Sequence, residues 1–271
     1  MIRTVNRLTT LFAVAVAFAF SAMMALTACA VEKGKKSEKE KGAQVFSFEK
    51  DAVGQLPKGW KADATNPKGP LAEWALAEDK TAPEGKALAI TKINDTAGGV
   101  FNLCFSPVAD FRDGEIEVRI KPLSGKTDQG GGLIWRAKDA RNYYIVRCNP
   151  LEPNLRLYYV KDGRRKMIAE VTGVNVPTGQ WSTIEVVQRG EKIEVSLNGK
   201  KMIEATDSTF TEAGAVGLWS KADAASAFAD FKVDMGKKEG MEVGKEAGEK
   251  VKGLEKAKAG QEKQGDNDND K

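Results

Sequence analysis

Short stretches of alternating apolar and polar residues, separated by turn dipeptides, run through residues 45–235. In residues 115–120 (EIEVRI), every second side chain is apolar, so one face of an extended strand would be buried. Aspartate or asparagine followed by glycine is typical of two-residue hairpin turns, and such pairs stand at Asp162-Gly163 and Asn198-Gly199. No part of this region shows a convincing helical period. The pattern predicts an all-β domain of antiparallel strands, a sandwich or a barrel.

The rest of the chain differs from this domain in composition. Residues 1–28 form a largely apolar leader, residues 29–44 a Lys/Glu-rich linker, and residues 236–271 a low-complexity charged tail. The net charge is +4, but the excess lies in the leader and the linker, so the domain is close to neutral. A neutral domain lacks the basic surface of a nucleic-acid binder. The tail ends in DNDND, which lacks the glycine and distal glutamate of a calcium loop, and we expect it to be disordered.

The leader has the parts of a secretion signal. Arg3 and Arg7 give a basic start, residues 11–20 (LFAVAVAFAF) are apolar, and small residues precede Cys29. The ending at residues 26–29 (LTAC) resembles the lipobox of bacterial lipoproteins. In that family the cysteine is acylated and the leader is cut before it, which predicts lipid on Cys29 and a membrane as partner.

More than one acyl chain would anchor the protein durably. By the familiar sorting rule, Ala30 after the cysteine is typical of delivery to the outer membrane in a host with two membranes, facing the periplasm or the exterior. The alternative is an uncleaved membrane helix, because residues 8–28 are long enough to span a bilayer. The linker has almost no apolar content, and we expect it to act as a flexible spacer.

A series of motifs follows a set order along the domain: VFSFE from 45, GQLPKGW from 54, GGGLIWRAKDARNYYIVRC at 130–148, WSTIEV from 181, LNGK from 197, GAVGL from 214 and FADFKV to 233. Their order and spacing resemble the concanavalin A-like lectin/glucanase superfamily. The nearest branch is similar to the laminin-G-like and 3-keto-disaccharide hydrolase-like domains of secreted bacterial proteins. The resemblance implies a jelly-roll sandwich of two antiparallel sheets. In those relatives that bind glycans, the concave sheet or the loops at its rim hold the ligand. Glycosidases and structural modules share this fold, so it does not decide the activity.

The turns set the register of the central strands through three pairings: Arg136 with Tyr143, Cys148 with Leu155, and Lys161 with Arg164. Alternate side chains then fall on two faces. The predicted core face is nearly all apolar: Leu133, Trp135, Tyr144, Val146, Cys148, Leu155, Leu157, Tyr159 and Ile168. The other face is mixed: Ile134, Arg136, Tyr143, Ile145, Arg147, Arg156, Tyr158 and Met167.

The mixed face supplies the candidate ligand-binding residues: Arg136, Tyr143, Arg147, Arg156 and Tyr158. Tyrosine rings can lie against the C–H face of a sugar, while phenol and guanidinium groups can hydrogen-bond hydroxyls or carboxylates. The alternative is an ordinary solvated sheet surface. On either interpretation these side chains point away from the core, and we expect them to be replaceable without unfolding.

Catalysis is the weaker hypothesis. The chain has no histidine, which removes the commonest general base and metal ligand. Glycoside hydrolysis needs two carboxylates beside the scissile bond, and the mixed face has none. Glu115 and Glu117 alternate with apolar residues on an edge-like strand and are expected to be solvated. We therefore predict a carbohydrate-binding protein without catalytic residues, cofactor or metal. A 3-keto-disaccharide hydrolase-like enzyme and a structural or interaction module without a ligand are the alternatives.

Two cysteines, Cys104 and Cys148, remain in the domain after lipidation. An exported compartment permits a disulfide. Phe101, Leu103 and Phe105 look like the core set of their strand, which would turn Cys104 outward, whereas Cys148 falls on the core face. Opposed directions argue against a bond, because its two Cβ atoms must approach to within about 4.5 Å.

Overall fold

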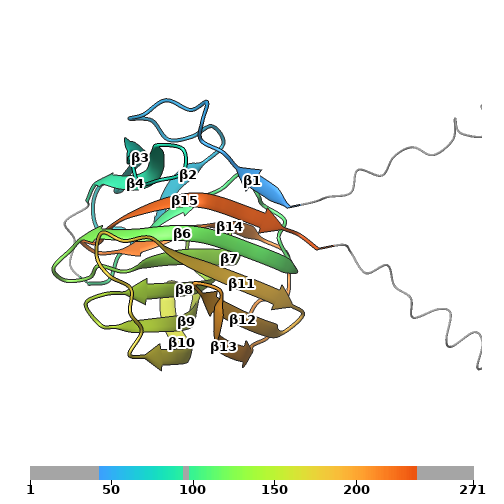
Figure 1. Ribbon diagram of the computed structural model, residues 1–271. Helices are drawn as coiled ribbons and strands as arrows, with labels where there is room; N and C mark the ends of the chain where they lie inside the picture. The colour runs from blue at the N-terminus through green and yellow to red at the C-terminus, as the bar shows by residue number, and fades with distance from the viewer. Residues whose placement is uncertain (1–42, 94–97, 237–271) are drawn as a thin grey trace, which may run out of the picture. The chain divides into compact units, whose positions relative to one another are not determined.

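A computed structural model of the chain describes residues 43–93 and 98–236 (Figure 1). All regular elements within these residues are β-strands, and they form two antiparallel sheets, which confirms the predicted sandwich. No helix in the described part is long and apolar enough to cross a membrane. The predicted leader, the lipidation site at Cys29 and nearly all of the linker and the tail lie outside the described residues.

One sheet has eight strands in the order β13-β12-β11-β6-β15-β4-β3, with β1 paired to β15. Its strands are β1 (Gln44–Phe46), β3 (Glu73–Glu78), β4 (Lys86–Lys92), β6 (Gly114–Ser124), β11 (Ser182–Arg189), β12 (Lys192–Leu197), β13 (Lys200–Thr206) and β15 (Ala225–Asp234). β1 runs antiparallel to β15, with Gln44 opposite Val233. The start of the described domain therefore lies beside its end, as Figure 1 shows.

The other sheet has seven strands in the order β10-β9-β8-β7-β14-β5-β2. They are β2 (Lys61–Thr65), β5 (Phe101–Phe105), β7 (Gly131–Asp139), β8 (Asn142–Asn149), β9 (Asn154–Lys161), β10 (Arg164–Thr172) and β14 (Ala215–Lys221). The observed pairings include Trp135 with Tyr144, Cys148 with Leu155, and Lys161 with Arg164. These confirm the register predicted for β8, β9, the start of β10 and β7 as far as Trp135.

Two hairpin turns have the backbone that their sequences predict. Asp162 and Gly163 join β9 to β10 with φ angles of 53° and 76°, and Asn198 and Gly199 join β12 to β13 with φ angles of 52° and 76°. Positive φ at both central residues defines the turn whose twist matches that of the flanking strands. Aspartate and asparagine tolerate this conformation better than other side chains do, and glycine adopts it freely.

The main core fills the space between the two sheets. It contains the predicted core residues of the seven-stranded sheet, with Tyr159 and Ile168 partly buried at its margin. From the eight-stranded sheet it receives apolar side chains that include Leu76, Leu88, Ile116, Val118, Ile184 and Phe228. The Trp135 indole N–H donates to Gln188 Oε1 at 2.8 Å, which satisfies a buried polar group while joining β7 to β11.

Strand β6 is central, so the prediction of an edge strand is wrong. It pairs with β11 on one side and β15 on the other. Its apolar residues face the core as predicted, while Glu115 and Glu117 form ion pairs with Arg189 and Lys232. Alternation identifies the buried face of a strand, but it carries no information about how many neighbours the strand has.

The predicted orientation of Cys104 is also wrong. Cys104 and Cys148 both point into the main core, whereas Phe101 and Leu103 face the opposite way. Both faces of β5 are apolar, so alternation could not identify the core face. Neither cysteine forms a disulfide. β7 and β14 lie between β8 and β5, which separates the two cysteines by three strand spacings, about 14 Å.

Candidate functional site

A second buried cluster lies on the face of the seven-stranded sheet that is turned away from the main core, here called the concave face. We call this cluster the inner cluster. Its members are Phe101, Leu103, Ile134, Ala137, Tyr143, Ile145, Tyr158, Val160 and Trp219. The cluster includes Tyr143 and Tyr158, so their predicted side of the sheet is confirmed. Their predicted exposure is wrong, because Tyr143 is 0% and Tyr158 only 5% exposed.

Curvature of the sheet encloses the inner cluster. The Arg165 guanidinium, on edge strand β10, lies 5.2 Å from the Phe101 ring on β5 and 5.9 Å from the Trp219 ring on β14. In a flat sheet β10 and β5 would be about 24 Å apart, because five strand spacings separate them. From the other edge, the Thr65 hydroxyl of β2 forms a 2.8 Å hydrogen bond with the Tyr143 hydroxyl of β8. The sheet therefore curls until side chains from its two edges meet over the hollow.

Arg136 leaves the concave face at a β-bulge. Its φ is 45°, and the pairing of β7 with β8 shifts between Trp135 and Asp139. The guanidinium then reaches the eight-stranded sheet and its loops, donating to the carbonyls of Arg112 (2.7 Å), Phe210 (2.7 Å) and Gly190 (2.8 Å) and to Asp113 Oδ1 (3.1 Å). Burial lowers the pKa of Arg136, and the Asp113 charge opposes that effect. Arg136 thus ties the two sheets together and lies apart from the other four candidates.

Charged side chains gather on the concave face of β8, β9 and β10. Arg147 is buried and donates to Asn154 Oδ1 at 2.6 Å and to Glu152 Oε2 at 2.6 Å. Arg156, the most accessible of the predicted residues, binds Glu152 at 2.8 Å and Glu170 at 2.5 Å. Burial acts to raise the pKa of Glu152, but the hydrogen bond and charge of Arg147 outweigh it and leave that pKa lowered. The prediction that this face has no carboxylate is therefore wrong, although these carboxylates are all ion-paired.

Arg165 is a site residue that the sequence analysis missed. It lies opposite Val160, and its guanidinium lies over the Tyr158 ring at 4.3 Å. Alternation backwards from Met167 would have placed Arg165 on this face. Met167 is 50% exposed, and the Arg156 side chain is 26% exposed. We call Arg156, Arg165 and Met167 the rim, because they border the filled hollow on β9 and β10.

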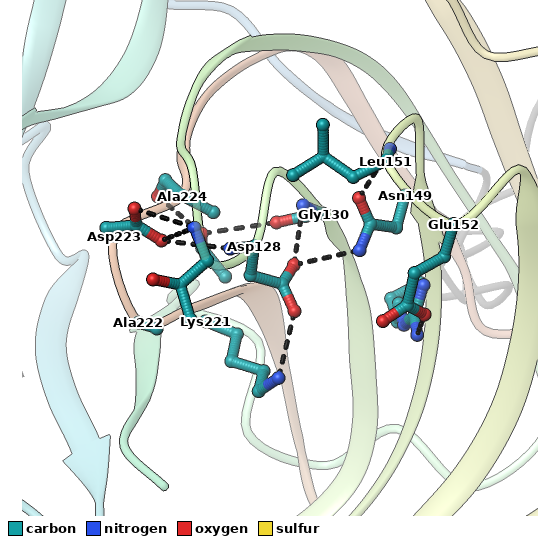
Figure 2. Close-up of polar contacts among 12 residues, drawn as sticks. Asp128, Gly130, Asn149, Leu151, Glu152, Lys221, Ala222, Asp223 and Ala224 are labelled. Atoms are coloured by element: carbon teal, nitrogen blue, oxygen red, sulfur yellow. Dashed lines mark hydrogen bonds and ion pairs between the residues drawn. The ribbon is translucent and has the colours of Figure 1, made fainter. Parts of the chain in front are cut away.

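A second polar cluster closes the end of the same sheet, and Figure 2 shows it. Asp128 is 1% exposed and forms an ion pair with Lys221 at 3.0 Å, while Asn149 donates to it at 3.3 Å. Asp223, in the turn between β14 and β15, accepts the backbone N–H groups of residues 126–128. Burial acts to raise the pKa of Asp223, but these N–H donors outweigh it and leave the pKa lowered. The cluster therefore holds the loop between β6 and β7 against that turn.

A separate pocket of about 400 Å³ lies beside these strands. It is lined by Pro150, Pro153 and residues 173–178, which include no charged side chain. Among the described residues, no group of three or more Cys, Asp or Glu side chains is arranged to hold a metal ion. What the concave side offers is guanidinium groups beside the half-exposed Met167.

The sequence matches the family described as the 3-keto-alpha-glucoside-1,2-lyase-like domain over residues 53–234. No curated protein matches the sequence. Among solved structures, the carbohydrate-binding module CBM66 from Bacillus subtilis is similar, with a TM-score of 0.52 and 22% identity. That alignment covers 65% of this chain and 96% of the module.

Two further structures are less similar. Domain 4 of AbnA, a GH43 extracellular arabinanase from Geobacillus stearothermophilus in complex with arabinotriose, gives a TM-score of 0.47 at 18% identity, covering 71% of this chain and 92% of that one. The Bacillus licheniformis β-glucanase gives 0.47 at 12% identity, covering 72% and 99%. At these identities the similarity concerns the fold alone. The resemblance to 3-keto-disaccharide hydrolase-like domains is confirmed by the family match, and the predicted sandwich of two antiparallel sheets is confirmed by the strand topology.

Proposed function

The chain belongs to the 3-keto-alpha-glucoside-1,2-lyase-like domain family, and from that premise we propose that it binds carbohydrate on the rim of its concave face while lipid on Cys29 anchors it outside the cytoplasm. The hollow itself is filled by the inner cluster, so a ligand lies on the rim rather than deep in the sheet.

The binding proposal rests on one observation: the rim places an apolar side chain beside guanidinium donors. Met167 is half exposed on β10, and it pairs across the strands with Tyr158, whose ring supports the Arg165 guanidinium. Arg156 lies on the same face of β9. A sugar ring has an apolar C–H face and polar hydroxyls at its edge, so it needs both kinds of surface side by side.

The test is a glycan array probed with the full chain and with Met167→Asp. We expect the wild-type protein to bind at least one carbohydrate, and Met167→Asp to lose that binding with an unchanged melting temperature. Leu123→Asp is the matched control, because Leu123 is 40% exposed on the eight-stranded sheet. Absence of any bound glycan, or equal losses in both variants, would refute binding at the rim.

The anchor is tested separately. Cys29→Ala should abolish labelling of the chain with palmitate in the producing bacterium, because thioether acylation requires the thiol. Labelling that persists in Cys29→Ala would place the acyl chain elsewhere.

The family description favours a second candidate, a lyase acting on a 3-keto-glucoside. The sequence has no histidine, and the concave-face carboxylates Asp128, Glu152 and Glu170 are held in ion pairs, which argues against a free general base. Incubation of the full chain with a 3-keto-α-glucoside tests this candidate. Turnover that disappears in Asp128→Asn would make the protein an enzyme.

A further inference from the structure

Arg165 differs from the other cations of the concave side because no carboxylate in the described part of the chain pairs with it. Three neighbouring cations have such partners: Arg147 with Glu152 (2.6 Å), Arg156 with Glu170 (2.5 Å) and Lys221 with Asp128 (3.0 Å). Within the described residues, Arg165 forms no ion pair, and its Nη1 is buried without a hydrogen-bond partner. Buried polar groups are nearly always hydrogen-bonded, so an exception of this kind requires an explanation.

Aromatic rings hold the Arg165 guanidinium in place. Its carbon lies 4.3 Å from the Tyr158 ring centroid, 5.2 Å from that of Phe101 and 5.9 Å from that of Trp219. These distances are typical of cation–π contacts, which engage the flat face of a guanidinium. Such contacts do not use the N–H donors at its edge. Nη1 is buried, but Arg165 as a whole is only partly buried, so the accessible part of its edge stays open to an acceptor.

The electrostatic surroundings also favour an anion. Burial lowers the pKa of Arg165 and the nearby positive charge of Arg147 lowers it further, while Tyr158 and the Asp128 charge oppose this only in part. The group nevertheless stays protonated, as arginine does in proteins. Arg147 itself has a buried Nε without a partner among the described residues. A carboxylate at the accessible edge of Arg165 would accept hydrogen bonds there and offset positive charge that is partly removed from water.

We propose that Arg165 binds the carboxylate of an acidic sugar, so that the protein recognises uronic-acid-containing glycans. This inference rests on the proposed carbohydrate binding at the rim and adds the chemical class of the ligand. A guanidinium matches a carboxylate with two parallel hydrogen bonds, a geometry that an ammonium or a hydroxyl cannot reproduce. Met167, two residues along β10, contacts the apolar face of the same sugar.

The test compares acidic oligosaccharides with neutral counterparts of the same backbone. Oligogalacturonate, glucuronoxylan and hyaluronan oligosaccharides are each titrated into the full chain in detergent, beside samples whose carboxyl groups have been reduced to alcohols. We expect at least one acidic oligosaccharide to bind, and its reduced counterpart to bind about tenfold more weakly or worse, which corresponds to the loss of one charge-assisted contact.

Two variants assign this preference to the residue. Arg165→Met keeps the apolar stem against the rings but removes the guanidinium, and it should abolish the difference between acidic and reduced forms. Arg164→Met removes the same charge from the exposed neighbouring residue and should preserve the difference. Melting temperatures of both variants check that the fold is intact.

The possible failures are distinguishable. Equal or stronger binding of neutral glycans overturns the inference and leaves carbohydrate binding standing. An acidic preference that falls equally in both variants is general charge attraction and also overturns it. Binding of no oligosaccharide in this set or on the glycan array refutes the inference together with the proposed function. A large loss of stability in Arg165→Met but not in Arg164→Met would show that Arg165 stabilises the fold instead of binding a ligand, and would overturn the inference.

Discussion

Arg136→Met tests the assignment of Arg136 as the tie between the two sheets. The guanidinium makes four hydrogen bonds, three of them to backbone carbonyls, and its side chain is 1% exposed. Methionine retains the apolar stem but leaves those acceptors without a donor. Removing one partner from a buried charged network costs about 3–5 kcal/mol of the free energy of unfolding.

For a domain of this size, about 1 kcal/mol lowers the melting temperature by about 2–4 °C. Arg136→Met should therefore lower it by about 6–20 °C in a thermal melt followed by circular dichroism. Arg164→Met, on the exposed start of β10, should change it by no more than about 2 °C. A loss in Arg136→Met as small as in that control would refute the assignment and support the solvated position that the sequence pattern predicted.

Three further predictions concern buried groups. Tyr158→Ala and Trp135→Ala should each destabilise the domain by about 3–5 kcal/mol, because both rings are buried. A urea titration in which Tyr158→Ala leaves the free energy of unfolding unchanged would contradict the burial of Tyr158 in the inner cluster. Burial raises the pKa of Cys148 to about 12, so this thiol should resist Ellman's reagent at pH 8 until the protein is unfolded, and rapid modification of the native protein would disprove its position. Burial raises the pKa of Tyr143, and burial and Asp207 raise that of Tyr144. The contribution of both tyrosines to the free energy of unfolding should be complete below about pH 10, the pKa of an unfolded tyrosine, and lost as the pH rises toward their higher folded pKa values. Phenolate absorbance should therefore rise together with unfolding. Phenolate absorbance that rises near pH 10 while the protein stays folded would contradict their burial.

The sequence predicts the architecture of this domain well because its signals are local. Alternation, the loop at residues 149–154 and the Asp162-Gly163 turn determine which residues pair across β8, β9 and β10, and the structure has those pairings. The bulge after Trp135 has no comparable signal, so the sequence pattern predicts the wrong surroundings for Arg136. On β5 the alternation itself is ambiguous, because apolar residues occupy both faces, and the orientation of Cys104 was reversed.

The candidate site was harder to predict because its environment depends on curvature. Tyr143 and Tyr158 lie on the predicted face, but side chains from the two edge strands, β2 and β10, cover them. No pattern within a single strand reports how far a sheet curls. Arg165 could have been found by extending the alternation along β10, whereas its contact with Phe101 requires the three-dimensional fold.

The most direct test of carbohydrate binding at the concave rim is hydrogen–deuterium exchange of the full chain with and without the best glycan from the array. Binding at the rim predicts slower amide exchange in β9 and β10, around Arg156 and Met167, with no change in the eight-stranded sheet. Protection confined to the pocket at residues 173–178 or to the eight-stranded sheet would contradict the account, as would the absence of any glycan that changes exchange.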